Sequence, residues 1–162
     1  MTQLTEPTVQ NQEDWKGVGF NNRRITYYNS PSATTIYKGQ NDGIFLFDSA
    51  AGIVYTLPSP TIGHEFTFIV TVTATTNFHK VITNSASVFI VGLMYGVATD
   101  NSNTSVAYVA NGTTHIAVKQ NGTTTGGYIG DQYTLKCVSS TLWAVQGTML
   151  QTGSTATPFS TS

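Results

Sequence analysis

The sequence predicts an all-β protein: an antiparallel β-sandwich or barrel of about ten short strands, with an extended N-terminal arm and an extended C-terminal tail. Strand-favouring residues are abundant, and threonine alone makes up roughly one residue in six. Helix-favouring residues are scarce, since glutamate occurs only at Glu6, Glu13 and Glu65. Short apolar segments alternate with turn residues, whereas the 3.6-residue period of an amphipathic helix is missing.

The N-terminal arm is predicted to span residues 1–32. Six charged residues crowd the first 24 positions, whereas the following 138 carry only nine. A turn sequence at Asn29 and Pro31 marks the boundary. The arm has too few apolar groups to fold alone. We expect Trp15 and Phe20 to dock on a partner, together with the pair Arg23 and Arg24, for which a solvated pair is an equally good interpretation.

The domain is predicted to span residues 33–150 and to be built from ten strands. Each strand is a run of β-branched, aromatic or alternating residues bounded by glycine, proline, asparagine or serine. The expected strands cover residues 34–38, 43–47, 53–57, 65–73, 80–83, 88–91, 105–110, 115–120, 133–138 and 142–147.

Two hairpins and one loop are expected to connect the late strands. Asn111-Gly112 joins two alternating runs, and both residues tolerate positive φ, which favours a hairpin. Residues 139–141 predict a second hairpin. The glycine-rich segment 121–130 predicts a loop, since it has too many glycines for a regular strand.

Alternation predicts which side chains enter the core. Phe66, Phe68 and Val70 share one face of their strand. The late hairpin is expected to bury a second set, which is Tyr133, Leu135, Cys137, Trp143 and Val145. Cys137 is the single cysteine, so no intrachain disulfide can form, and we interpret it as a small buried strand residue.

The C-terminal tail, residues 151–162, carries no charge and one bulky side chain, Phe159. Pro158 favours an extended chain before it. A tail of this kind is either disordered or laid across a neighbour, and Phe159 favours docking on a partner.

Composition narrows the classes of function. A net charge of -1 gives no electrostatic attraction for nucleic acid or an anionic membrane. Only 9% of the residues are charged, which suits a surface covered by other protein. No apolar run is long enough for a membrane helix and no secretion signal is recognisable, so we expect assembly in a cytoplasm.

No catalytic or cofactor motif emerges, and we therefore expect no enzyme activity, no cofactor and no bound metal. None of the three histidines, His64, His79 and His115, has a second ligand at metal-binding spacing. Asp42 and Asp131 lie in Asp-Gly and Gly-Asp turn sequences. No serine occupies a nucleophile elbow, and Gly126-Gly127 lacks the lysine and helix of a phosphate loop.

The chain from Asp48 onward resembles a group of small tailed-phage virion proteins that are similar to capsid decoration, or cement, proteins. The resemblance depends on five motifs. These are Thr-Leu-Pro at 56–58, the alternating strand at 66–70, the Gly-Gly-x-x-Gly-Asp loop at 126–131, Trp-x-Val-x-Gly at 143–147 and the tail at 152–159. All five are structural motifs.

The resemblance implies a homotrimeric β-domain on the outer surface of a virion capsid, with the major capsid protein and two further copies of itself as partners. The contacts to the shell would come from Trp15, Phe20, Arg23, Arg24 and Phe159. A tail-fibre or receptor-binding β-module that recognises host surface glycan is the alternative. An enzyme grafted on a β-fold is a third possibility that no motif supports.

Overall fold

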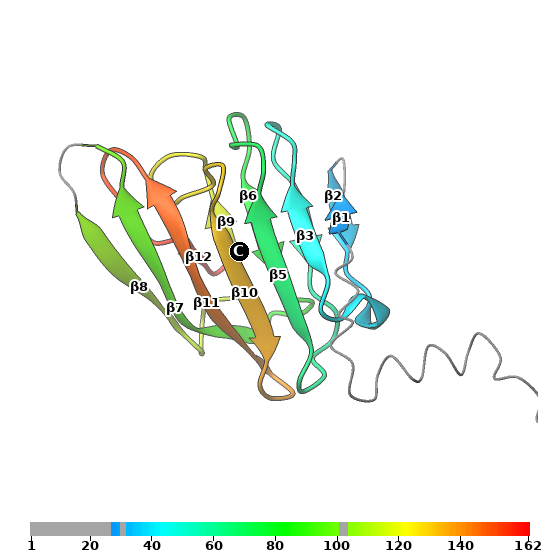
Figure 1. Cartoon of the computed structure of the whole chain (residues 1–162). Coiled ribbons are helices and arrows are strands. Elements are labelled where there is room, and N and C mark those ends of the chain that lie inside the picture. The colour runs from blue at the N-terminus through cyan, green and yellow to red at the C-terminus, as the bar shows by residue number, and fades with distance from the viewer. Residues whose placement is uncertain (1–26, 30–31, 101–103) are drawn as a thin grey trace, which may run out of the picture.

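The computed structural model is a two-layered β-sandwich, which confirms the predicted all-β class and the sandwich alternative (Figure 1). It describes residues 27–29, 32–100 and 104–162. Within these ranges the chain forms twelve strands and one short 3-10 helix, η1 (Lys38–Gln40).

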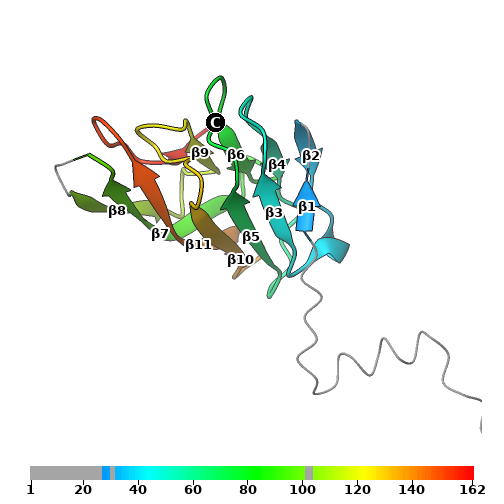
Figure 2. The same ribbon diagram turned by 45° about the horizontal axis from the view of Figure 1, so that its top comes forward.

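Seven strands form the larger sheet, which lies in front in Figure 1. From one edge to the other they are β1 (Tyr27–Asn29), β3 (Ile44–Phe47), β5 (Glu65–Val70), β10 (Gln132–Cys137), β11 (Leu142–Gln151), β7 (Phe89–Ala98) and β8 (Ser105–Asn111). Five strands form the smaller sheet behind it, in the order β12 (Phe159–Ser160), β9 (Ala117–Gln120), β6 (His79–Ile82), β4 (Val54–Thr56) and β2 (Ala33–Thr35) (Figure 2).

Both sheets are mixed, so the predicted antiparallel arrangement is wrong. Strands β1, β3 and β5 pair in parallel, as do β2, β4 and β6, and β7 pairs in parallel with β11. The first six strands alternate between the two sheets, so the chain crosses the sandwich after each strand. A strand that returns to its own sheet after two such crossings runs in its original direction, which produces the parallel pairs among the first six strands.

One of the two predicted hairpins forms. Residues 139–141 connect β10 to β11, whose antiparallel register pairs Leu135 with Val145 and Cys137 with Trp143. The hairpin predicted at Asn111-Gly112 is wrong, because β8 and β9 lie in different sheets. The turn itself is present: Gly112 has φ of 71°, and Asn111 Oδ1 accepts hydrogen bonds from the backbone N–H groups of Thr113 and Thr114.

The core lies between the sheets and is rich in aromatic rings. Phe45 contacts Tyr55, Phe66 and Phe68, with ring centroids 5.3, 5.9 and 5.5 Å apart. Trp143 is fully buried and packs on Phe66 at 5.6 Å. The predicted facing is confirmed, since all eight residues expected to enter the core from β5, β10 and β11 are buried, including the free thiol of Cys137.

Both predicted extensions contribute strands to the domain. Residues 27–29 form β1, where Tyr28 stacks on Phe45 at 4.8 Å and its carbonyl accepts from the Tyr55 hydroxyl. At the other end, the chain leaves β11 at Gln151 and reaches the edge of the smaller sheet, where β12 pairs with β9. The described residues at either end therefore fold on their own domain.

Candidate functional site

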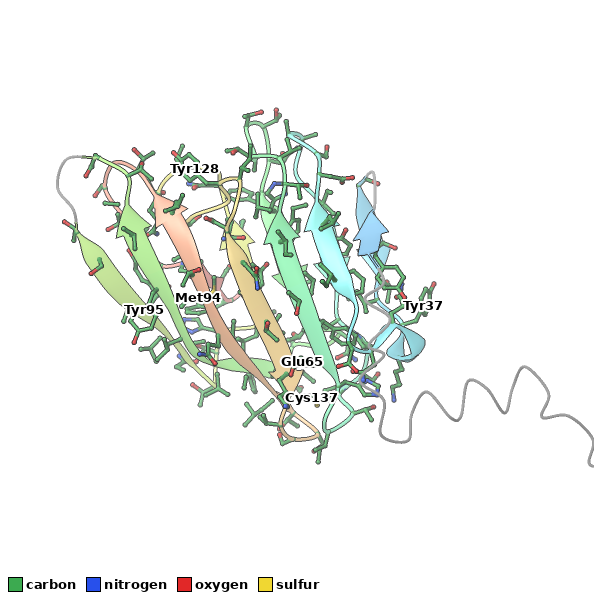
Figure 3. All side chains as sticks on the ribbon, viewed as in Figure 1. Tyr37, Glu65, Met94, Tyr95, Tyr128 and Cys137 are labelled. Atoms are coloured by element: carbon green, nitrogen blue, oxygen red, sulfur yellow. The ribbon has the colours of Figure 1, made fainter. Side chains whose placement is uncertain are left out.

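The outer surface of the larger sheet carries an apolar area over β7, β8 and β11. The register places Leu93 opposite Val109, Tyr95 opposite Ala107, and Val97 beside Leu150, so these side chains share one face. Buried partners such as Met94 point to the opposite side (Figure 3). We call these six outward residues the β7–β8 face: Leu93, Tyr95, Val97, Ala107, Val109 and Leu150.

The β7–β8 face is solvent-exposed in the isolated chain. Val109 is 65% exposed, Tyr95 51% and Leu150 39%. A sheet with one face on the core ordinarily presents polar residues on the other. A contiguous exposed apolar area of this kind is a candidate interaction surface.

Among the described strands, β8 lies at the end of the larger sheet and pairs with β7 alone. It is seven residues long and has the sequence Ser-Val-Ala-Tyr-Val-Ala-Asn, without proline, lysine or any other charge. Natural edge strands are usually protected from pairing by such residues. The unprotected edge therefore adds main-chain hydrogen-bonding groups to the apolar side chains of the β7–β8 face.

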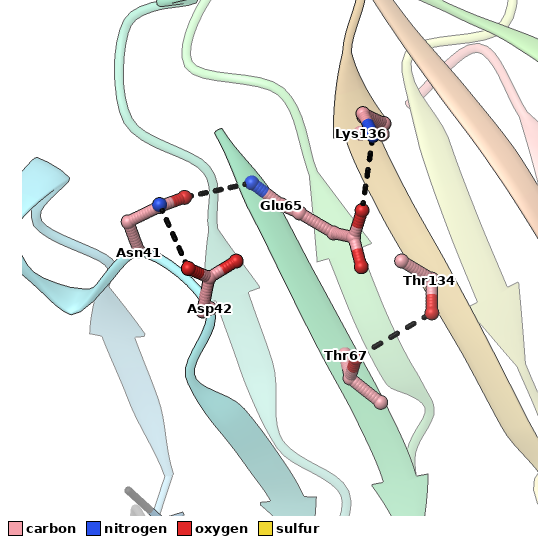
Figure 4. Close-up of polar contacts among 6 residues, drawn as sticks. All are labelled: Asn41, Asp42, Glu65, Thr67, Thr134 and Lys136. Atoms are coloured by element: carbon pink, nitrogen blue, oxygen red, sulfur yellow. Dashed lines mark hydrogen bonds and ion pairs between the residues drawn. The ribbon is translucent and has the colours of Figure 1, made fainter. Parts of the chain in front are cut away.

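The remainder of the outer surface has the opposite character over β5 and β10. Lys136 Nζ lies 3.5 Å from Glu65 Oε2, and the hydroxyls of Thr67 and Thr134 are 3.4 Å apart (Figure 4). The backbone N–H of Glu65 donates to Asn41 Oδ1 at 2.8 Å. This polar half pairs its charges and hydroxyls internally, whereas the β7–β8 face is apolar apart from the Tyr95 hydroxyl.

A buried carboxylate fixes the loop behind the β7–β8 face. Asp131 is 1% exposed, and its Oδ2 accepts from the backbone N–H groups of Gly127 and Tyr128 at 2.7 and 3.2 Å. Its Oδ1 accepts from the N–H of Leu150 at 2.8 Å, which ties the loop to β11. Burial raises the pKa of Asp131 to about 6, although the three backbone donors oppose this shift.

Of the five predicted contact residues, the structure describes one. Trp15, Phe20, Arg23 and Arg24 lie outside the described residues. Phe159 is 5% exposed, belongs to the core and stacks on His115 at 5.7 Å. The prediction that Phe159 anchors the tail on a partner is therefore wrong: the ring closes one edge of its own sandwich.

The β7–β8 face was missed because its strands alternate less clearly than the others. In β8 the inward residues are Val106, Tyr108 and Ala110, yet Ala107 and Val109 on the other face are also apolar. A strand that is apolar on both sides and lacks charge was the available signal. The exposed position of β8 at the edge of the sheet becomes evident only from the three-dimensional strand order.

The chemistry of the described residues is that of a packed sandwich. No group of three or more His, Cys, Asp or Glu side chains in residues 27–29, 32–100 and 104–162 is placed to hold a metal ion. Within the same part of the chain, no helix has the length and hydropathy needed to cross a membrane.

Comparison of the chain with models of known protein families and with curated proteins finds no match.

Proposed function

We propose that this protein is a structural component of a tailed-phage virion, a capsid decoration protein that assembles as a trimer on the outer shell and reinforces contacts between capsid subunits. The observation that carries the proposal is the β7–β8 face, with its open β8 edge. The resemblance of its sequence motifs to those of small virion proteins supports the same role.

A second copy of this chain is the occupant that we assign to the β7–β8 face. Strands β7, β8 and β11 contain no charged residue, so two such faces meet without repulsion. A depression of about 210 Å³ between Val97, Leu150 and Gly130 adjoins the face and has room for an apolar side chain of a neighbour. In the proposed trimer the three faces lie around the central axis.

Adhesion to the shell is assigned to the N-terminal segment, with Trp15, Phe20, Arg23 and Arg24 as its contacts to the major capsid protein. Burial of apolar surface contributes about 25 cal/mol per Å² before ordering costs are subtracted. Three segments on one trimer bind with avidity, because the second and third attachments are intramolecular. Many such bridges would raise the free energy needed to separate capsid subunits.

Self-association is tested by Val109→Lys, which places an ammonium group in the proposed subunit contact. Because Val109 is 65% exposed, the domain should keep its stability. The association constant should fall at least about tenfold, since the lysine would be buried without a partner. Light scattering across a dilution series measures the association constant.

The matched control is Thr134→Lys, which adds the same charge to the polar half of the same sheet and should leave association unchanged. A Val109→Lys protein that assembles like the wild type would remove the β7–β8 face from the proposal. Copy number per virion separates decoration from the fibre alternative, because a shell offers far more attachment positions than a tail.

A further inference from the structure

A second surface feature lies on the outer side of the smaller sheet, away from the β7–β8 face. One row of paired residues crosses four strands there: Ala33 on β2, Val54 on β4, Lys80 on β6 and Lys119 on β9. This row lies along an open depression of about 380 Å³. The depression is also lined by Ser32, Ala51, Gly52, Asn77 and Phe78.

The two lysines occupy directly opposed positions of antiparallel strands, where like charges destabilise a sheet. Burial lowers the pKa of Lys80, and the charge of Lys119 lowers it further. None of the described residues lining the depression is acidic, and neither lysine forms an ion pair with a described residue. The arrangement therefore lacks a counter-charge that a bound anion would supply.

The walls of the depression are suited to a ring-shaped ligand. Phe78 is 41% exposed, and Lys119 Nζ lies 4.1 Å from its ring centroid. Gly52 has φ of 85°, and a Cβ at this position would come within 2.5 Å of the Phe78 carbonyl oxygen. Glycine at this position thus lets the chain before β4 pack against the Phe78 backbone and fixes the ring at the rim.

We propose that this depression binds an acidic sugar, a pyranose that carries a carboxylate. The two ammonium groups would receive the carboxylate, the Asn77 amide would meet a hydroxyl, and the small apolar residues Ala33 and Val54 would contact the ring. Its volume is that of ordinary small-ligand sites. An acidic side chain of a protein partner would use the lysines and leave most of the depression unfilled.

The site is independent of the proposed self-association, because it lies on the other sheet. One site would give a decorated shell only a weak affinity for acidic polysaccharide. Many copies of the site on one particle would strengthen the overall binding through avidity. Its failure would leave the role of the β7–β8 face untouched, since that role is measured by oligomeric state.

The test is a titration of the full-length, isotope-labelled protein with a galacturonic acid trisaccharide, followed by amide chemical shifts. The neutral galactose trisaccharide is the control ligand. We expect shifts that concentrate on β2, β4, β6 and β9, with a Kd on the order of 1 mM that weakens as salt is added. Equal binding of the neutral sugar would overturn the proposal.

Two variants define the contribution of the site. Lys80→Gln combined with Lys119→Gln should weaken trisaccharide binding at least about tenfold while leaving the fold intact, because it removes a like-charge contact. The matched control replaces Lys38 and Lys136, two lysines of the domain that lie outside the site, and should bind as the wild type does. Equal loss in both double variants would mean attraction by overall charge alone and would overturn the site.

Ala33→Trp fills the depression and keeps both lysines. Ala33 is exposed on an edge strand, so the substitution should be tolerated and should abolish binding of the sugar. Retained binding would overturn the assignment of the depression. A synthetic peptide of residues 1–26 that shifts the same signals and displaces the trisaccharide would assign the lysines to acidic side chains of the chain's own N-terminal segment, and would also overturn the proposal.

Discussion

The side chain of Asp131 connects the 121–130 loop to strand β11, and its protonation affects the stability of the domain. The carboxylate accepts four hydrogen bonds, one of them from the side-chain amide of Gln120 at 3.4 Å. It therefore joins β9, β11 and the 121–130 loop. The sequence context suggested ordinary turn chemistry. Burial gives the same residue a structural role that a Gly-Asp dipeptide does not reveal.

The raised pKa of Asp131, about 6 against an ordinary value of 3.8, makes stability depend on pH. The folded state binds the proton more tightly than the unfolded state does. Protonation of this carboxyl therefore adds to the free energy of unfolding as the pH falls through 6, by about 1 kcal/mol between roughly pH 7 and pH 5. Urea denaturation at a series of pH values measures the slope.

The variant Asp131→Asn isolates this contribution. At neutral pH it should lower the free energy of unfolding by about 1 to 3 kcal/mol, because an amide cannot accept all the hydrogen bonds made by the carboxylate. Its deficit relative to the wild type should widen as the pH falls. The pKa of His79 is lowered by burial, so its stabilising contribution is lost on acidification, and this opposing slope is common to both proteins. A constant deficit would contradict the assignment to Asp131.

At the scale of elements, strand periodicity predicted most of the sandwich, whereas strand order did not follow from the sequence. The alternation in β5 identified its buried face, and the turn at 139–141 identified its hairpin correctly. Asn111-Gly112 has the same local chemistry as a hairpin turn, yet the chain leaves the sheet there. Pairing partners depend on contacts between residues far apart in sequence, so local signals could not distinguish these two turns.

Strand β12 is predicted to stabilise the domain. Removing residues 158–162 deletes Phe159, uncovers the edge of β9 and exposes Val118, which is fully buried in the intact chain. We expect the free energy of unfolding to fall by about 3 kcal/mol or more, as for loss of a buried aromatic ring. Thermal or chemical denaturation provides the comparison. Unchanged stability together with lost shell binding would restore the docking role originally expected for the tail.

At the scale of the whole molecule, the low charge and the β-rich composition follow directly from the sequence. The position of the exposed apolar surface could not be predicted from it. The β7–β8 face combines two consecutive strands with β11, which comes much later in the sequence. Lys80 and Lys119 lie on paired strands that are separated along the chain by β7 and β8. Both surfaces are products of the fold.

Deleting residues 1–26 separates the proposed shell contact from the domain. The shortened protein should fold and self-associate like the full chain, because β1 and the β7–β8 face are kept, but it should no longer cosediment with purified shells. Extending the deletion through residue 32 should also destabilise the domain, since it removes the stack of Tyr28 on Phe45. Full shell binding after the shorter deletion would contradict the assignment of adhesion to this segment.

The unguarded rim formed by β8 has a consequence for how the protein must be produced. Any copy not yet assembled into a trimer exposes a ready template for edge-to-edge polymerisation, and the rate of that side reaction rises with concentration. Synthesis in step with the growing supply of shells would keep the free pool dilute. Chains released from a dissociated trimer should yield gels or filaments, so the property that makes the molecule a good adhesive also limits its storage.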